Sequence, residues 1–338
     1  MLDVTAAAWA ITLGVIFGLF ILDFAVAVLR PHSVGFREAA LWSVFYIGVA
    51  IAFGFVFAGN AGWDFGTEYF AGYLVEKSLS VDNLFVFAII LGTFAVPEEH
   101  QHKVLIFGIA LALALRAVFI ALGATLISLF SVMFLLFGVL LIWTAVQLFR
   151  HRNEDPDIED NALVRATRRV FPVASEYDGG SLFTRIDGRR VITPLFIVLI
   201  AIGSTDLLFA LDSIPAVFGV TEEAYIVFCA NAFALLGLRA LYFLVTGLLD
   251  RLVYLSTGLA MILGLIGVKL LLHWAHDDVD SSVPEIETGT SLIIIAAILV
   301  TVTIASVIKV RRDPEARARA GSLRVTRSRP TEQDDQGA

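Results

Sequence analysis

The amino-acid sequence predicts an all-α polytopic membrane protein. Hydrophobic residues make up 58% of the 338 residues and charged residues 17%, whereas charged residues are about 25% of an ordinary soluble domain. Nine apolar stretches are each long enough to cross a bilayer as a helix, which needs about 20 residues. This composition excludes a water-soluble globular enzyme and a disordered chain.

The nine predicted spans follow one another within a transmembrane domain at residues 1–310. They are expected near residues 8–29, 39–58, 70–96, 103–125, 127–149, 191–220, 224–247, 252–273 and 290–310. With the N-terminus outside, the predicted inner segments hold 20 of the 24 Lys and Arg residues, and the outer segments hold none. Because these residues collect on the cytoplasmic side, we expect the N-terminus out and the C-terminus in.

Two segments are predicted to lie outside the bilayer on the cytoplasmic side. Residues 150–190 carry sixteen charges, eight of each sign, which indicates a small folded loop subdomain. Within it, alternating residues flank Asp187-Gly188, a typical turn dipeptide, and predict a β-hairpin over 181–193. Residues 311–338 are basic and rich in turn-forming residues, and they predict a disordered tail.

Two parts of the chain resemble each other, at about 70–149 and about 191–273. Each has an acid, a second acid six residues later with a small polar neighbour, and an arginine in the next helix. These residues are Glu76, Asp82, Asn83 and Arg116 in the first part, and Asp206, Asp212, Ser213 and Arg239 in the second. As three-helix units they would be inverted repeats, an arrangement common in secondary transporters. A chance similarity between apolar stretches is the alternative.

Seven ionisable residues fall well inside the predicted spans. They are Asp23, Glu76, Asp82, Arg116, Asp206, Asp212 and Arg239. Each mid-membrane charge costs about 2.5–3.5 kcal/mol, so these side chains must pair, hold a proton or face a hydrated cavity. Five acids against two arginines leave an acidic surplus, which suits a cation, protons or both.

The candidate ligands offer oxygen atoms, which suit Mg²⁺, Ca²⁺ or Mn²⁺. The predicted metal site comprises Asp82, Asn83, Asp212, Asp206, Glu76 and Ser213. Asp23 is a candidate proton carrier or extra ligand, and Arg116 and Arg239 are expected to form structural ion pairs. Lys77 and Lys269 are left out, because long lysines can extend to the membrane surface.

Helical spacing places Glu76 with Asn83, and Asp206 with Ser213, on one face of each helix. Asp82 and Asp212 lie about 100° round from these faces. A helix break at Pro215, which has no N–H to donate, would bring Asp212 toward the site. We expect Asp82 and Asp212 to approach each other near the membrane centre.

Several other functions find no support in the sequence. A net charge of −8 without a basic stripe argues against a nucleic-acid partner. No HExxH, GxSxG or Cys/His pair indicates an enzyme, and no resident cofactor is predicted. The expected partners are the lipid bilayer and a divalent metal ion, and no particular protein partner is indicated.

Four runs of sequence resemble the TerC integral membrane family. These are GYLVEKSLSVDNLFVFAII, VLIFGIALALALRAVFIALGA, FPVASEYDGGSLFTRIDGRRVITPLF and STDLLFALDSIPAVFGVTEEAYIVFCANAFALLGLRALYFL. The six predicted metal ligands match the family's motif positions. The family was named for tellurium resistance and has members linked to manganese efflux, so the resemblance implies a bacterial cytoplasmic membrane. Many members have an acid where this chain has Gly203, and Asp23 or water would then complete the coordination.

Two hypotheses of function follow from the residues and the resemblance together. The first is an exporter of divalent metal cations, with Mn²⁺ as the expected substrate and protons as the expected exchange partner. The second is a non-transporting membrane component that anchors a tellurite or stress-resistance complex through the 150–190 loop and the C-terminal tail. The acidic surplus inside the membrane favours the exporter, because a scaffold has no use for it.

Overall fold

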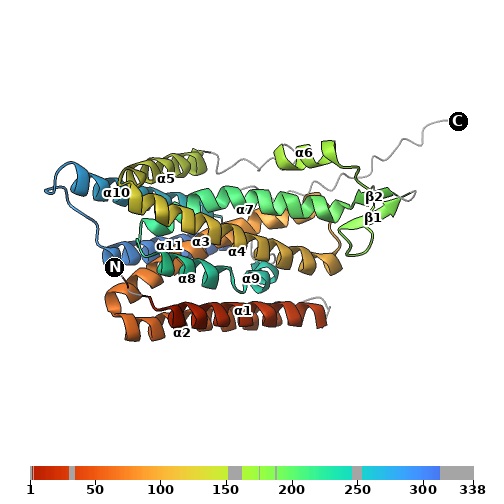
Figure 1. Cartoon of the computed structure of the whole chain (residues 1–338), viewed down its shortest axis with the longest axis horizontal. Coiled ribbons are helices and arrows are strands. Elements are labelled where there is room, and N and C mark those ends of the chain that lie inside the picture. Colours follow the sequence, from red (N-terminus) through yellow and green to blue (C-terminus); the bar gives the residue numbers. More distant parts are fainter. Residues whose placement is uncertain are drawn as a thin grey trace.

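The computed structural model describes residues 2, 4–29, 35–150, 162–174, 176–186, 189–245 and 253–312. They form an elongated helical bundle with a two-stranded sheet at one end (Figure 1). The elements are α1 (Ala6–Leu29), α2 (Phe36–Ala61), α3 (Trp63–Thr93), α4 (Glu98–Leu129), α5 (Val132–Arg150), α6 (Ala162–Val170), β1 (Phe183–Ile186), β2 (Arg189–Ile192), α7 (Pro194–Phe218), α8 (Ala224–Leu235), α9 (Leu238–Val245), α10 (Leu255–Asp278) and α11 (Thr288–Arg312).

The helices support the predicted polytopic membrane protein. Among the described residues, seven are long and apolar enough to cross a membrane: α1, α2, α4, α5, α7, α10 and α11. The pair α8 and α9, bent by 41° at a short break, makes an eighth if it is one span. The all-helical fold class is therefore confirmed.

Helix α3 corresponds to the remaining predicted span, and it is less apolar than the others. Its 31 residues include five charged ones: Asp64, Glu68, Glu76, Lys77 and Asp82. It packs against α2, α7, α8 and α11, which surround it in the bundle. A charged helix at this place avoids lipid, because its polar groups find partners on other helices. The count of nine spans and the inverted repeats stay predictions.

The predicted span at 224–247 is broken in the structure. Helix α8 ends at Leu235 and α9 begins at Leu238, with Gly237 between them at a φ of +76°. A Cβ on Gly237 would lie 2.6 Å from the Cβ of Tyr46 on α2. Both the backbone conformation and the close approach of α2 therefore require glycine at this position.

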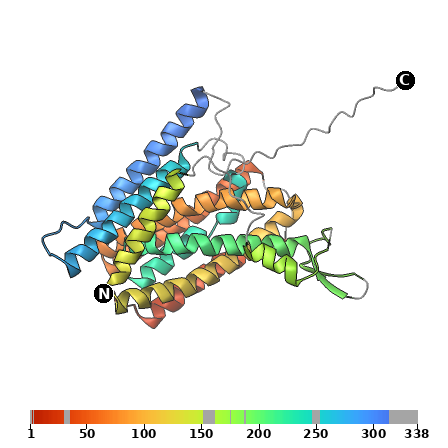
Figure 2. The same ribbon diagram turned by 90° about the horizontal axis from the view of Figure 1, so that it is seen from above.

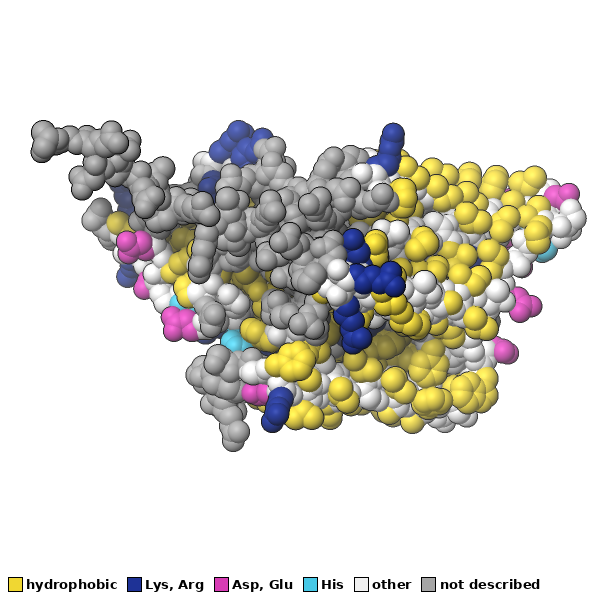
Figure 3. Space-filling model, turned by 180° about the vertical axis from the view of Figure 1, so that it is seen from behind, with side chains coloured by type: hydrophobic (Ala, Val, Ile, Leu, Met, Phe, Trp, Pro, Cys, Tyr) yellow, Lys and Arg dark blue, Asp and Glu magenta, His cyan; other side chains and the backbone are white. Residues whose placement is uncertain are grey.

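The outer helices expose large apolar side chains, as a lipid-facing surface requires. Ile11 is 68% exposed, Leu41 72% and Ile293 71%. Hydrophobic side chains cover much of the right-hand half of the face in Figure 3, with a few acidic side chains at its right-hand edge. Figure 2 shows α5, α10 and α11 side by side, crossing the rest of the bundle at an angle. An apolar area of this extent is unfavourable in water.

The predicted hairpin over 181–193 is present at one end of the bundle. Strand β1 pairs antiparallel with β2, from Phe183 opposite Ile192 to Ile186 opposite Arg189. The turn residues 187–188 lie outside the described residues. Helix α6, which the sequence did not predict within the loop, packs against α7. The tail from 313 onward is outside the described residues, so its disorder stays a prediction.

Candidate functional site

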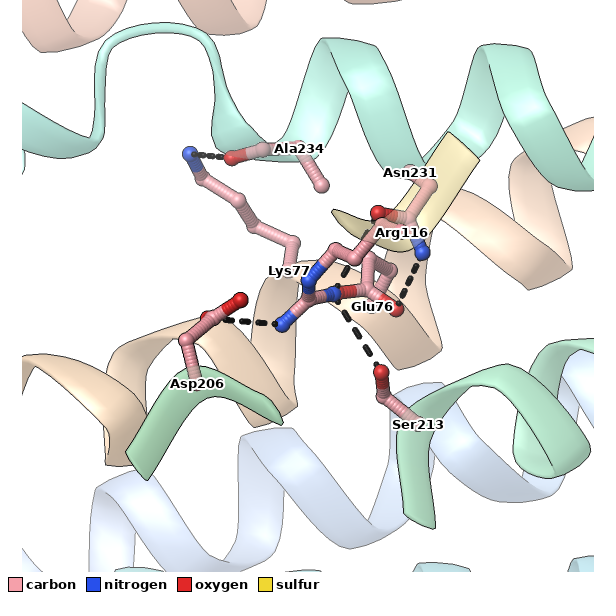
Figure 4. A network of polar contacts seen from close by, with 7 residues as sticks. All are labelled: Glu76, Lys77, Arg116, Asp206, Ser213, Asn231 and Ala234. Atoms are coloured by element: carbon pink, nitrogen blue, oxygen red, sulfur yellow. Dashed lines mark hydrogen bonds and ion pairs between the residues drawn. The ribbon is translucent and has the colours of Figure 1, made fainter. Parts of the chain in front are cut away.

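Arg116 on α4 is the centre of a buried polar cluster (Figure 4). Its side chain is fully buried, and its Nη1 donates hydrogen bonds to Oε1 of Glu76 and, at 3.2 Å, to Oγ of Ser213. Nη1 also lies 3.3 Å from Oδ1 of Asn231, and Nη2 donates to Oδ1 of Asp206 at 3.3 Å. One guanidinium thus joins side chains from α3, α7 and α8.

Two amides complete this group. Nδ2 of Asn231 donates to Oε2 of Glu76 at 3.0 Å. When its amide oxygen faces Arg116, Asn83 accepts a hydrogen bond from Nη2 at 3.2 Å and donates one to the carbonyl of Leu79. We call Glu76, Asn83, Arg116, Asp206, Ser213 and Asn231 the Arg116 cluster.

The helical spacing explains why these side chains meet. Glu76 and Asn83 are seven residues apart on α3, and so are Asp206 and Ser213 on α7. Residues seven apart lie on one face of a helix, two turns from each other. Because α3 packs on α7 and α8, and α4 also packs on both, the polar faces are brought together. The shared faces that the sequence predicted are therefore confirmed.

The Arg116 cluster holds more negative than positive groups. Two buried carboxylates, Glu76 and Asp206, contact a single guanidinium. Within the described part of the chain, Oδ2 of Asp206 has no hydrogen-bond partner. A buried carboxylate oxygen without a partner is unfavourable and rare in native proteins. The cluster is therefore chemically suited to a further cation or a proton.

Asp212 is half-buried, and among the described residues no hydrogen bond joins it to Arg116. It accepts a hydrogen bond from Oγ1 of Thr144 on α5 at 3.0 Å. Helix α7 continues through Pro215 to Phe218, so the break expected near Asp212 is wrong. Without a break, Asp212 keeps its position about 100° round from Asp206 and Ser213. It faces a pocket of about 330 Å³ that Asn83 and Ser213 also line.

The backbone of Asp82 is part of α3, but its side chain is not among those that the structure describes. The expected approach of Asp82 to Asp212 therefore stays a prediction.

Asp23 and Arg239 form a separate buried ion pair. Nη2 of Arg239 on α9 lies 2.9 Å from Oδ1 of Asp23 on α1, and Nε lies 3.2 Å from both carboxylate oxygens. The hydroxyl of Tyr46 on α2 donates a further bond to Asp23 at 3.2 Å. Asp23 thus pairs with Arg239, and no hydrogen bond among the described residues joins it to the Arg116 cluster.

Sequence comparisons identify the family. A family model described as the integral membrane protein TerC family matches residues 61–314. The chain belongs to the TerC family. An uncharacterized membrane protein of Mycobacterium tuberculosis is 45% identical over 325 residues, which cover 92% of this chain and 82% of that protein.

Two other relatives extend the range of organisms in which TerC proteins occur. An uncharacterized membrane protein of Myxococcus xanthus is 40% identical over 316 residues, covering 92% of this chain and 95% of its own. The thylakoid membrane protein TERC of Arabidopsis thaliana is 41% identical over 245 residues, which cover 72% of this chain and 63% of that protein. No solved structure matches the chain.

Gly203 on α7 lies close to Leu111 on α4. A Cβ at this position on α7 would lie 2.7 Å from Cδ2 of Leu111 on α4. A larger side chain would therefore have to displace Leu111.

Two residues of the site were missed by sequence reasoning, and a third was placed wrongly. Asn231 and Thr144 are polar residues within apolar stretches, and that feature is the signal that could have found them. Lys77 was expected to extend toward the membrane surface. Instead, its Nζ donates to the carbonyl of Ala234 at 3.1 Å, beside the end of α8 (Figure 4).

Proposed function

We propose that this TerC protein exports divalent metal cations across the cytoplasmic membrane, with Mn²⁺ as substrate and protons as the exchanged ion. One observation carries the proposal. Asn83 and Ser213 belong to the Arg116 cluster and also line the pocket that holds Asp212. Carboxylate, carboxamide and hydroxyl oxygens thus surround a space beside buried acids, and such oxygens suit Mn²⁺.

The charges of the cluster suggest how metal and protons are exchanged. Glu76 and Asp206 both contact Arg116, and carboxylates held this close repel each other when both are ionised. Arg116 holds both acids in place while the metal is absent. A divalent cation that enters the pocket lined by Asp212, Asn83 and Ser213 supplies positive charge beside these acids and displaces a proton. Rebinding of protons from the more acidic side then favours release.

The rival function is a membrane component of a tellurite or stress-resistance complex that transports nothing. The observation in its favour is the part of the 150–190 loop that the structure describes. Val170 is 71% exposed there, Phe171 50% and Phe183 51%, and apolar side chains of this kind are common at docking surfaces. A scaffold of this type requires no acidic surplus in the membrane.

Metal transport by the purified protein separates the two functions. Proteoliposomes containing the parent should take up Mn²⁺, and the Asp212→Asn variant should lose about tenfold or more of the uptake at equal protein content. Asp64→Asn is the matched control, because Asp64 is exposed near the start of α3. It should transport as the parent does.

Cellular manganese provides the second measurement, in a strain that lacks its other exporters. Asp82→Asn and Asp212→Asn should insert into the membrane but leave cellular manganese high. If both variants lower cellular manganese as well as the parent at matched expression, the carboxylate site is wrong. If the parent moves no Mn²⁺ in proteoliposomes, the scaffold becomes the better interpretation.

A further inference from the structure

One histidine and three acidic side chains lie together at the end of the bundle opposite the hairpin. There the α7–α8 connection, the end of α10 and the α10–α11 connection meet (Figure 1). His273 and Asp277 come from α10, Glu222 precedes α8, and Glu285 precedes α11. We call these four residues the His273 cluster.

Carboxylates face both ring nitrogens of His273. Nδ1 lies 2.6 Å from Oε1 of Glu285, and Nε2 lies 3.0 Å from Oε1 of Glu222. Asp277, one turn further along α10, places Oδ2 3.6 Å from Nε2. Ligand atoms of His273, Asp277 and Glu285 all lie within 4.8 Å of one another. Metal–ligand distances of about 2.0–2.2 Å therefore require only small side-chain movements.

His276, three residues later on the same helix, has a different environment from His273 and serves as a comparison. Its Nδ1 lies 2.8 Å from the backbone carbonyl of Val283, so a neutral group holds its ring. His273 differs because a carboxylate orients one nitrogen while the other faces two more acids. A metal-binding histidine commonly donates its second ring N–H to a carboxylate in this way.

Cations in solution can reach this cluster. The side chain of His273 is 28% exposed, that of Asp277 53% and that of Glu222 58%. The cluster borders a pocket of about 450 Å³, whose lining also includes Glu68, Glu223, Glu287 and Lys269. Lys269 donates a hydrogen bond to Oγ1 of Thr288 at 3.1 Å. Acids exceed bases in this lining, and such a pocket raises the local concentration of cations.

We propose that the His273 cluster is a second binding site for a divalent transition-metal cation. A ring nitrogen of His273 and carboxylate oxygens of Asp277 and Glu285 are the protein ligands, and Glu222 faces the ring at Nε2. One imidazole nitrogen with carboxylate oxygens suits Mn²⁺ or Zn²⁺. The site holds the cation at one mouth of the bundle, and it does not depend on transport through the Arg116 cluster.

A nitrogen ligand distinguishes this site from the pocket beside the Arg116 cluster, where the proposed metal ligands are oxygen atoms. The full-length protein in detergent, freed of metal and then loaded with Mn²⁺, should show ¹⁴N coupling to manganese in pulsed electron paramagnetic resonance. His273→Gln should abolish the coupling. His276→Gln is the matched control and should retain it. Retention of the coupling in Asp212→Asn, whether or not that variant transports, shows that the two sites are independent.

Two further variants test the geometry with the histidine still present. Asp277→Asn and Glu285→Gln each remove a carboxylate ligand. Each should weaken the Mn²⁺ binding that gives the nitrogen signal by about tenfold or more, as for other metal-site partners. The absence of ¹⁴N coupling in the parent, or its persistence in His273→Gln, would overturn the proposal. Unchanged affinity in both carboxylate variants would overturn it as well.

Discussion

Two arginines are buried in the bundle at corresponding positions of the two similar segments, and their surroundings differ. Among the described residues, the carboxylate that pairs with Arg239 is that of Asp23, which it contacts through both Nε and Nη2. Arg116 contacts two carboxylates, Glu76 and Asp206, together with amide and hydroxyl groups. The first arrangement joins α1 to α9, whereas the second joins α4 to α3, α7 and α8.

The difference lies in charge balance and in the neighbouring space. The Asp23–Arg239 pair is neutral, and its carboxylate is also held by Tyr46, so it holds helices together without requiring another ion. The Arg116 cluster carries an excess acid, and it adjoins the pocket of Asp212. A buried arginine alone therefore indicates little about function. The number of acids around it, and the room beside them, separate a structural ion pair from a cation site.

The largest expected effect is that of Arg116→Ala. It leaves two carboxylates buried without their cation, and the loss of one partner of a buried ion pair costs about 3–5 kcal/mol. The variant should be strongly reduced in the membrane fraction. Fluorescence-detected size-exclusion chromatography of a tagged protein measures this abundance directly. An abundance equal to the parent's would show that Arg116 does not compensate the two acids.

Arg239→Ala should also lower the abundance of the protein. At this site, neutralising Asp23 together with Arg239 should restore the abundance. Asp23→Asn combined with Arg239→Gln leaves no ion without its partner at this pair. Glu76→Gln combined with Arg116→Gln still leaves Asp206 buried and uncompensated, and should recover less. Thermal unfolding of the two double variants in detergent measures the contrast. Equal recovery in both would remove the difference between the regions.

The smallest effect is expected for single hydrogen bonds in the two regions. Asn231→Ala removes the donor to Oε2 of Glu76 and should cost about 1–3 kcal/mol, the range for a buried group left unsatisfied. Tyr46→Phe removes one bond to Asp23, which keeps Arg239, and should cost about 1 kcal/mol. Melting temperatures of the purified variants, compared under one condition, test this order. A larger loss for Tyr46→Phe would contradict it.

The sequence by itself determined the membrane class, the hairpin and the polar faces of two helices. Long apolar stretches are local, and so is the alternation of residues around Asp187-Gly188. The seven-residue spacing of Glu76 with Asn83, and of Asp206 with Ser213, is also local, because helical periodicity depends on the backbone of one segment only. The same periodicity correctly set Asp212 apart from Asp206, and α7 keeps that separation because it does not break at Pro215.

Only the tertiary structure decided which groups become partners. Both arginines follow the same short motif, yet Arg116 meets acids from both similar segments and Arg239 meets Asp23 from a helix outside them. Asn231 belongs to the cluster because α8 packs on α3 and α4. Glycine is required at position 237, between α8 and α9, because α2 approaches closely there. These choices depend on how helices distant in sequence pack. Spacing within one helix carries no information about which residue of another helix will face it.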